Sequence, residues 1–285
     1  MRPYEILDVF TGTPLAGNPL AVVHEADGLS TDRMQAIAAE FNLSETIFLH
    51  APQGDAVPAR IFTPRDEMPF AGHPTVGGSV AQALKTGASQ LALTLPAGRV
   101  DVTITGGDVR RATFDAPVLP RAEPLDIAVE DLARLVNLDP ADIVTDTYRP
   151  ARITSGPWFT AIPVRRVAAL ADARFMTGHV GVLGDAPRSL YLVAKGADGY
   201  RARMFAPFSG IEEDPATGSA AVALAAMVLA AETPPDGTHA VAIRQGVEMG
   251  RASDITISAE VAGGALKRVS LSGEAVVIAR GTLLV

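Results

Sequence analysis

RIFTPRDEMPFAGHPTVGGSVA, residues 60–81, and RMFAPFSGIEEDPATGSAAVAL, residues 203–224, are two versions of one pattern. Each begins with arginine, an apolar residue and phenylalanine, continues through a turn-rich loop to a His-Pro or Asp-Pro pair, and ends in glycine and small residues. The loop is two residues shorter in the second copy. Because the copies lie about half a chain apart, they predict two related halves, each with a strand, a loop and a helix.

Hydrophobic patterning around these stretches predicts much sheet and four helices. Many short runs are rich in Val, Ile, Thr and Phe and are bounded by Gly, Pro or Asp, as is typical of strands. The expected helices are 31–41 with Ser30 as its cap, 74–85, 129–136 and 215–231. The second and fourth are apolar on nearly every side, and such a helix has to be surrounded by protein. A sheet curled around each of them gives an α+β fold rather than a doubly wound parallel sheet.

Three prolines cluster in FDAPVLPRAEPLD, residues 114–126, and mark the boundary between the halves. We therefore expect an N-terminal half at 1–118 and a C-terminal half at 119–285, with the last strand free to pack back on the first half. Each half would hold one of the two apolar helices.

Composition narrows the function to small-molecule chemistry. A formal net charge of -8 gives no basic face for nucleic acid or an anionic membrane. The chain has no cysteine, which excludes disulfides, thiolate nucleophiles and cysteine-bound zinc, and its five histidines show no ligand spacing, so no metal is expected. The longest apolar run, 219–231, is shorter than the roughly 20 residues that span a bilayer. The N-terminus lacks a signal pattern, and we expect a cytoplasmic protein.

The two loops place a polar residue, His73 or Asp214, directly before a proline that would open a helix. Asp214 followed by Pro215 is also what a simple helix cap looks like, and that interpretation stays open. Histidine is a poor cap, and its ordinary pKa near neutrality suits proton transfer. If the halves face each other, both helix starts would offer free N–H groups to a carboxylate.

The glycines in these loops, Gly72, Gly77 and Gly218, would let a ligand approach the backbone closely. The competing explanation is that they serve tight turns and helix packing, most of all at Gly77. The adjacent acids Glu212 and Glu213 would raise the pKa of Asp214 if its side chain turned inwards, because like charges and burial both favour the neutral acid.

Glu45 lies in NLSETIFL, residues 42–49, on the face that an extended strand shares with Leu43, Ile47 and Leu49. A carboxylate on an apolar face loses hydration, which lifts its pKa towards the range of a general base. The alternative is that Glu45 lies at the end of the strand and simply reaches water.

These segments resemble the PhzF family of phenazine biosynthesis isomerases over essentially the whole chain. The similarity is carried by the segments DVFTGTPLAGNPLAVV (8–23), NLSETIFL (42–49), both loop stretches and RQGVEMGR (244–251). The family is similar in fold to diaminopimelate epimerase, with two pseudo-symmetric halves, each a sheet around a central helix, and the active site in the cleft between them. That epimerase uses two cysteines, and this chain has none, so two-thiol racemisation is excluded.

The resemblance implies a role for each candidate residue. Glu45 matches the family's general acid/base, which moves a proton between carbons of a cyclic dihydro-hydroxyanthranilate without cofactor or metal. His73, Asp214 and Ser219 match the assisting polar residues around the substrate. In the family, two glycine-containing loops hold the substrate's carboxylate. The matching residues here are Gly72, Gly77, Thr217 and Gly218. Relatives are commonly homodimers.

Two alternatives remain open from the sequence. The same fold could act as an epimerase or hydrolase on another small acid, because family membership fixes the scaffold and not the substrate. It could also bind a small molecule without turnover, although a binding protein does not require a base on an apolar face.

Overall fold

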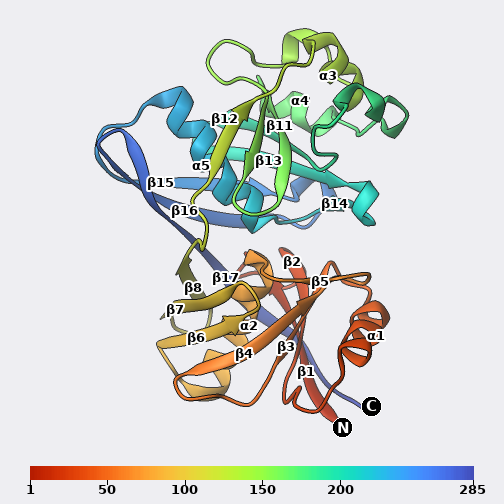
Figure 1. Cartoon of the computed structure of the whole chain (residues 1–285), viewed down its shortest axis with the longest axis vertical. Coiled ribbons are helices and arrows are strands. Elements are labelled where there is room, and N and C mark those ends of the chain that lie inside the picture. Colours follow the sequence, from red (N-terminus) through yellow and green to blue (C-terminus); the bar gives the residue numbers. More distant parts are fainter. The chain divides into compact units, whose positions relative to one another are not determined.

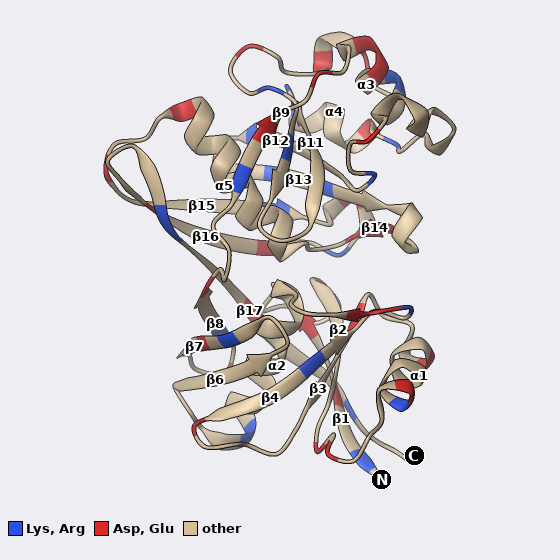
Figure 2. Ribbon diagram, viewed as in Figure 1, with Lys and Arg blue, Asp and Glu red and all other residues tan.

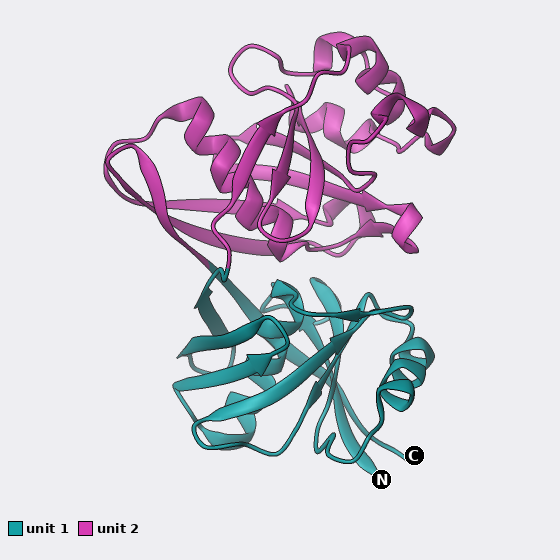
Figure 3. Cartoon of the chain, in the orientation of Figure 1, with its two compact units in different colours: residues 1–117, 271–285 teal, residues 118–270 magenta.

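The structure is a computed structural model that describes residues 1 to 285, and it divides into two compact units (Figure 3). Unit 1 comprises residues 1–117 and 271–285, and unit 2 comprises residues 118–270. The last strand begins in unit 2 and finishes in unit 1, so unit 1 is assembled from both ends of the chain.

Unit 1 is a curled sheet with one helix inside it and one outside (Figure 1). Its helices are α1 (Thr31–Phe41) and α2 (Gly72–Thr86). Its strands are β1 (Arg2–Val9), β2 (Asn18–Val23), β3 (Glu45–Leu49), β4 (Ala56–Phe62), β5 (Glu67–Met68), β6 (Gln90–Leu95), β7 (Gly98–Gly106), β8 (Arg110–Asp115) and the C-terminal part of β17 (Ala265–Leu283).

The strands of unit 1 close into a ring around α2. Pairing runs from β1 through β2, β3, β4, β6, β7 and β8 to β17, and β17 pairs again with β1. Helix α2 contacts β1, β2, β3, β6, β7 and β8. Its only Lys, Arg, Asp or Glu is Lys85, in its last turn, and Figure 2 draws the labelled part of α2 in tan. A helix with so little polar surface is stable only inside such an enclosure.

Helix α1 packs on the other face of this sheet and has the predicted bounds. The Ser30 hydroxyl accepts a hydrogen bond from the Arg33 amide, and Asn42 ends the helix in the left-handed region with a φ of 51°. Met34 and Ile37 pack with Phe48 of β3 in a small second core. The amphipathic pattern of α1 therefore fits a surface helix.

Unit 2 repeats this plan and adds an outer layer. Its helices are α3 (Val129–Val136), α4 (Val167–Asp172) and α5 (Gly218–Glu232), with short 3₁₀ turns at Pro140–Asp142, Thr177–Leu183, Pro207–Ser209 and Val247–Met249. Its strands are β9 (Arg121–Pro124), β10 (Ala151–Thr154), β11 (Trp158–Val164), β12 (Leu190–Gly196), β13 (Gly199–Ala206), β14 (Ile211–Asp214), β15 (Gly237–Gln245) and β16 (Ser253–Ala262). Helix α5 contacts β9, β10 and β16, while α3 and α4 cover the outer face of β11, β12 and β13.

The two units share one order of strand pairing. From β1 to β7, successive pairs are antiparallel, parallel, antiparallel, antiparallel, parallel and antiparallel, with the short β5 beside β4. The pairs from β10 to β16 follow the same order, with the short β14 beside β13. The internal echo in the sequence therefore corresponds to a duplicated structural unit.

Both echoes also build the same ion pair. Arg60 bonds Glu67 through two N–H groups, at 2.7 and 2.6 Å, and its guanidinium lies over the Phe62 ring. Arg203 bonds Glu213 in the same bidentate way, at 2.8 and 2.9 Å. Its guanidinium lies over the ring two residues further on, as in the first copy. In each unit this contact ties the longer strand to its short partner, β5 or β14.

The starts of α2 and α5 differ from the predictions. Helix α2 begins at Gly72, so His73 lies inside its first turn rather than before it. Helix α5 begins at Gly218 instead of 215, and its N-cap residue is Thr217. The interpretation of Asp214 as a helix cap is therefore wrong. Asp214 ends β14, and the three residues after it form a connection to the helix.

None of the helices combines the length and apolar character needed to cross a bilayer. The longest, α2 and α5, have 15 residues each, and their apolar surfaces are buried against strands.

Gly77 allows α2 to pack closely against the sheet. A Cβ at this position would lie 2.7 Å from Val9 Cγ2 and closer still to Leu20 Cδ2. We expect Gly77→Ala to lower the free energy of unfolding by about 1–3 kcal/mol, because the fully buried neighbours have little room to move. Urea denaturation measures this, with Gly107→Ala as control, since nothing lies within 4 Å of its Cβ. Equal stability of the two variants would show that packing does not require Gly77.

Glu5 links three strands of unit 1. His24 and Arg280 contact its carboxylate at 3.1 and 2.8 Å, and its side chain is 14% exposed. The His24 hydrogen bond, with help from Arg280, holds the pKa of Glu5 below its usual 4.5 despite burial. A lowered folded pKa stabilises the protein above the unfolded pKa, and this stability is lost as pH falls through the folded pKa.

We therefore expect Glu5→Gln to cost about 1 kcal/mol of unfolding free energy at pH 7 and progressively less below pH 4.5. Denaturant midpoints measured from pH 7 to pH 3 test this, with the exposed Glu40→Gln as control. A difference from the parent protein that stayed constant over this range would contradict the assignment.

Candidate active site

Glu45 and His73 form a hydrogen-bonded pair in unit 1. Glu45 is the first residue of β3, and His73 is the second residue of α2. His73 Nδ1 lies 2.8 Å from Glu45 Oε2, and the two side chains are 4% and 15% exposed. The sequence singled out both residues, and the structure brings them together.

Strand alternation explains why Glu45 points towards α2. Ile47, two residues along β3, lies against Gly78 of α2, where an added Cβ would come within 2.8 Å of Ile47 Cδ1. Glu45 is on the same face of the strand as Ile47. It does lie at the end of the strand, as the alternative interpretation required, but most of its side chain is shielded from water and its carboxylate contacts His73.

The second ring nitrogen of His73 is buried without a hydrogen-bond partner. When Glu45 is ionised, Nδ1 carries the hydrogen and donates it, so Nε2 is left as an acceptor. The same helix end has no side-chain cap and no acidic residue in its first turn. The N-terminus of α2 thus places a carboxylate and an unsatisfied ring nitrogen beside uncapped amides, and these amides favour a negatively charged ligand group.

Unit 2 holds Asp214 in a second hydrogen-bonded group. The Thr217 hydroxyl donates to Asp214 Oδ2 at 2.5 Å, and the Gln245 amide donates to the Asp214 carbonyl at 2.8 Å. Gln245 also donates to the Thr217 hydroxyl at 3.0 Å and accepts from the Thr217 backbone N–H at 3.3 Å. Asp214, Thr217 and Gln245 are 6%, 8% and 0% exposed. Buried hydrogen bonds therefore fix the connection between β14 and α5.

The turn after Gln245 requires a glycine. Gly246 has a φ of 72°, and a Cβ there would meet the carbonyl oxygens of Pro215 and Arg251 at 2.6 and 2.5 Å. This close contact fixes Gln245 against the connection that contains Asp214. The same contact is the physical reason for a glycine within the stretch RQGVEMGR.

The three consecutive acids of β14, Glu212, Glu213 and Asp214, point to alternating faces of the strand. Glu213 is engaged by Arg203, whose guanidinium also donates to carbonyls at the end of α4. Asp214 points to the opposite face of β14, towards α5, and Glu212 is exposed. The three acids therefore do not form one cluster.

The remaining candidates lie at the helix starts. Ser219 is the second residue of α5, and its carbonyl accepts a hydrogen bond from the buried Ser155 hydroxyl at 2.8 Å. Gly72 and Gly218 are the first residues of α2 and α5. Gly77 is one turn further into α2, and its contacts with Val9 and Leu20 account for a glycine there by packing alone. A substrate contact at these glycines stays a prediction.

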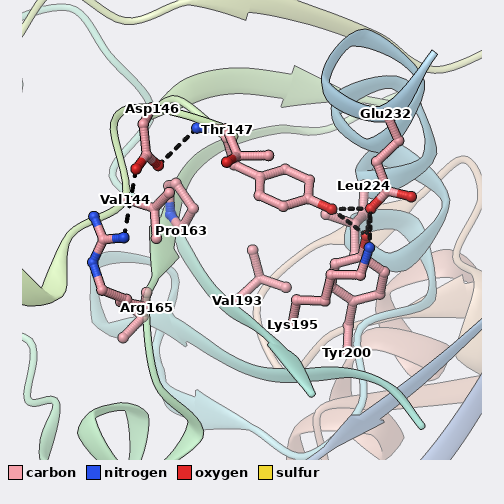
Figure 4. Close-up of a pocket in the computed structure, with 12 residues that line it drawn as sticks. Val144, Asp146, Thr147, Pro163, Arg165, Val193, Lys195, Tyr200, Leu224 and Glu232 are labelled. Carbon is pink, nitrogen blue, oxygen red and sulfur yellow. Dashed lines mark hydrogen bonds and ion pairs between the residues drawn. The ribbon is translucent and has the colours of Figure 1, made fainter. Parts of the chain in front are cut away.

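A separate cavity of about 300 Å³ lies at the other end of α5 (Figure 4). Tyr148, Lys195 and Tyr200 converge on Oε1 of Glu232, the last residue of α5, with the Tyr200 hydroxyl at 2.9 Å. Their polar groups satisfy one another, and Val193 also lines the cavity. This network anchors the C-terminal end of α5 and contains none of the predicted site residues.

Sequence reasoning missed three buried polar residues near the predicted ones: Ser155, Tyr191 and Gln245. Each comes from a strand or turn that is distant in the chain from the predicted residues, so no local pattern identifies it. The chain brings no group of three His, Asp or Glu side chains together in a way that could hold a metal ion.

Comparisons with known proteins cover the whole chain. The family model described as phenazine biosynthesis-like protein, PhzC-PhzF, matches residues 7–281. A trans-2,3-dihydro-3-hydroxyanthranilate isomerase of Pseudomonas chlororaphis is 37% identical over 289 residues, and the alignment covers 100% of both chains. Identity at this level over the full length of both chains shows membership of the same family as well as a shared fold.

Solved structures agree with the predicted fold class. The PhzF-family protein of Bacillus anthracis has a TM-score of 0.89 at 22% identity, covering 100% of this chain and 99% of that one. A hydroxyproline epimerase of Agrobacterium vitis has a TM-score of 0.66 at 14% identity, covering 98% and 91%. The α+β, diaminopimelate epimerase-like fold is confirmed. The chain belongs to the phenazine biosynthesis-like (PhzC-PhzF) family and is an isomerase of that family.

Proposed function

We propose that this protein is a cofactor-independent isomerase that moves a proton between two carbons of a small, cyclic, dihydro-hydroxyanthranilate-like carboxylate. The substrate class comes from the full-length relative in P. chlororaphis, which is named for trans-2,3-dihydro-3-hydroxyanthranilate. The observation that carries the reaction type is the 2.8 Å contact between Glu45 and His73 at the uncapped start of α2.

Glu45 is the base in this proposal. A carboxylate abstracts a proton from carbon effectively only when it is positioned and partly dehydrated, and Glu45 is both. His73 holds Oε2, which leaves Oε1 to take the proton. The electron pair left on carbon delocalises through the adjacent double bond, and the protonated Glu45 returns its proton to the far end of that system. The net result is a 1,3 shift with no change in oxidation state.

The amides of α2 stabilise negative charge in the same proposal, and His73 holds the Glu45 carboxylate in place. Uncapped N–H groups at a helix start favour a carboxylate, and fixed donors stabilise the charge that develops on the substrate. When the carbon that loses its proton carries a hydroxyl, the shift leaves an enol, and Asp214, fixed by Thr217 and Gln245, relays the second proton from the enol oxygen to carbon as the ketone forms. Ser219 and Thr217 assist in binding. Formation of a homodimer and a cytoplasmic location stay predictions.

We expect Glu45→Gln to fold normally and to reduce turnover by at least about 100-fold, the range typical of losing a general base. The measurement incubates trans-2,3-dihydro-3-hydroxyanthranilate with the protein in D₂O and follows deuterium entry into carbon by proton NMR. Glu130→Gln, in an exposed position of α3, is the control and should exchange like the parent protein.

Undiminished deuterium entry with Glu45→Gln would remove Glu45 from the mechanism. Two other results would favour the alternatives from the sequence. Exchange at a single carbon with inversion, on a different small acid, would indicate an epimerase. Tight binding of the acid with no exchange in the parent protein would indicate a binding protein.

A further inference from the structure

Tyr191 carries a buried hydroxyl with no hydrogen-bond partner. The residue lies in β12, is 0% exposed and is among the largest fully buried side chains of the chain. An unpaired buried polar group costs stability, and phenylalanine would fill the same space without that cost. Packing therefore gives no reason for the hydroxyl.

The position of Tyr191 suggests such a reason. In the register of unit 2, Tyr191 pairs with Met204 of β13, and Met204 pairs with Asp214 of β14. Residues paired across neighbouring strands point to the same face, so these three side chains form one row. Two strand spacings separate the backbones of Tyr191 and Asp214 by ~10 Å, and the long tyrosine side chain extends over part of that distance.

This row lies on the face of the sheet that α5 covers. Leu190 and Leu192 pack on the opposite, outer face with the core of α3 and α4. Val193, two residues after Tyr191 in β12, points to the same face as Tyr191. Val193 lines a cavity together with Leu224 of α5. The hydroxyl of Tyr191 is therefore enclosed on the same side of the sheet as the Asp214 carboxylate.

The electrostatics keep the Tyr191 hydroxyl protonated. Burial raises the pKa of Tyr191 far above its usual value, and the negative charge of Asp214 raises it further. A neutral phenol rotates its hydrogen to suit its surroundings, and in a dry interior a hydrogen turned towards a carboxylate stabilises the charge.

Charged residues also lie on the elements around Asp214, among them the Arg201–Glu248 pair of β13 and the turn after β15. Glu213 faces Arg203 on the opposite side of β14, and Glu212 is exposed. Gln245 of β15 is neutral, and the first turn of α5 carries no acid. Arg251 belongs to the turn that packs on Pro215 through Gly246.

We propose that Tyr191 is a positioning residue for Asp214, whose hydroxyl turns its hydrogen towards the carboxylate and stabilises the ionised form. Its importance for turnover rests on the proposed function, in which Asp214 handles a proton. Its effect on the titration of Asp214 does not depend on that function, because it is a property of the folded protein.

The test is a carbon-13 NMR titration of the Asp carboxyl carbons in the parent protein and in Tyr191→Phe, with Asp214→Asn to assign the signal. We expect Tyr191→Phe to raise the pKa of Asp214 by about 0.5 or more, because the carboxylate loses a stabilising dipole. Tyr200→Phe is the matched control, since its hydroxyl contacts Glu232 at the other end of α5. It should leave the Asp214 titration unchanged.

Thermal unfolding separates this role from a structural one. At a pH below the titration of Asp214, where its carboxyl is neutral in both proteins, the hydroxyl has no protein hydrogen bond to lose, so Tyr191→Phe should unfold there at the same or a higher temperature. An unchanged Asp214 titration would overturn the proposal, with or without a change in Tm.

The pH profile of turnover then distinguishes the two proposals. If the titration of Asp214 and the pH profile shift together, both are supported. If the titration shifts and the pH profile does not, Tyr191 acts on Asp214 as proposed, but Asp214 has no part in proton transfer.

Discussion

The enclosure of two almost wholly apolar helices is the constraint on which the structure depends. Helices α2 and α5 each carry a single Lys, Arg, Asp or Glu residue, which lies in the last turn. Exposing the apolar surface of either helix to water would therefore be unfavourable. A flat sheet covers only one side of a helix, whereas a curled sheet covers several. In unit 1 the ring closes only because β17 pairs with both β1 and β8. Burial of α2 thus depends on both ends of the chain.

This constraint also determines where chemistry can occur. The side of an enclosed helix is packed, as the contact of Gly77 with Val9 and Leu20 shows. The helix start is different, because its N–H groups have no partners within the helix and must find them elsewhere. Neither N-cap residue, Ala71 or Thr217, caps its helix with its own side chain, and at α5 Gln245 accepts from the Thr217 amide. Some of the shielded polar groups lie at these points, His73 and Glu45 at the start of α2 and Asp214 and Thr217 at the start of α5.

Local sequence patterns predicted the elements better than their ends or their partners. The helices 31–41 and 129–136 were predicted with the bounds found, because caps and periodicity are local signals. The start of α5 was misplaced by three residues, because Asp-Pro imitates a cap where β14 in fact continues to Asp214. The pairing of Glu45 with His73 was foreseen only as two separate candidates. Gln245 and Tyr191 were missed, since strand register alone brings them near Asp214.

The duplicated unit separates what supports the fold from what performs chemistry. The arginine stacked on phenylalanine and paired with glutamate occurs in both copies, at Arg60 and at Arg203, and joins equivalent strands. The helix starts have diverged. One offers a histidine within the first turn and a glutamate from β3, and the other an aspartate at the end of β14 fixed by Gln245. If both helix starts performed the same chemical step, we would expect the same acid at both. Two different acids with different partners instead fit the unequal roles that the proposed reaction gives to Glu45 and Asp214.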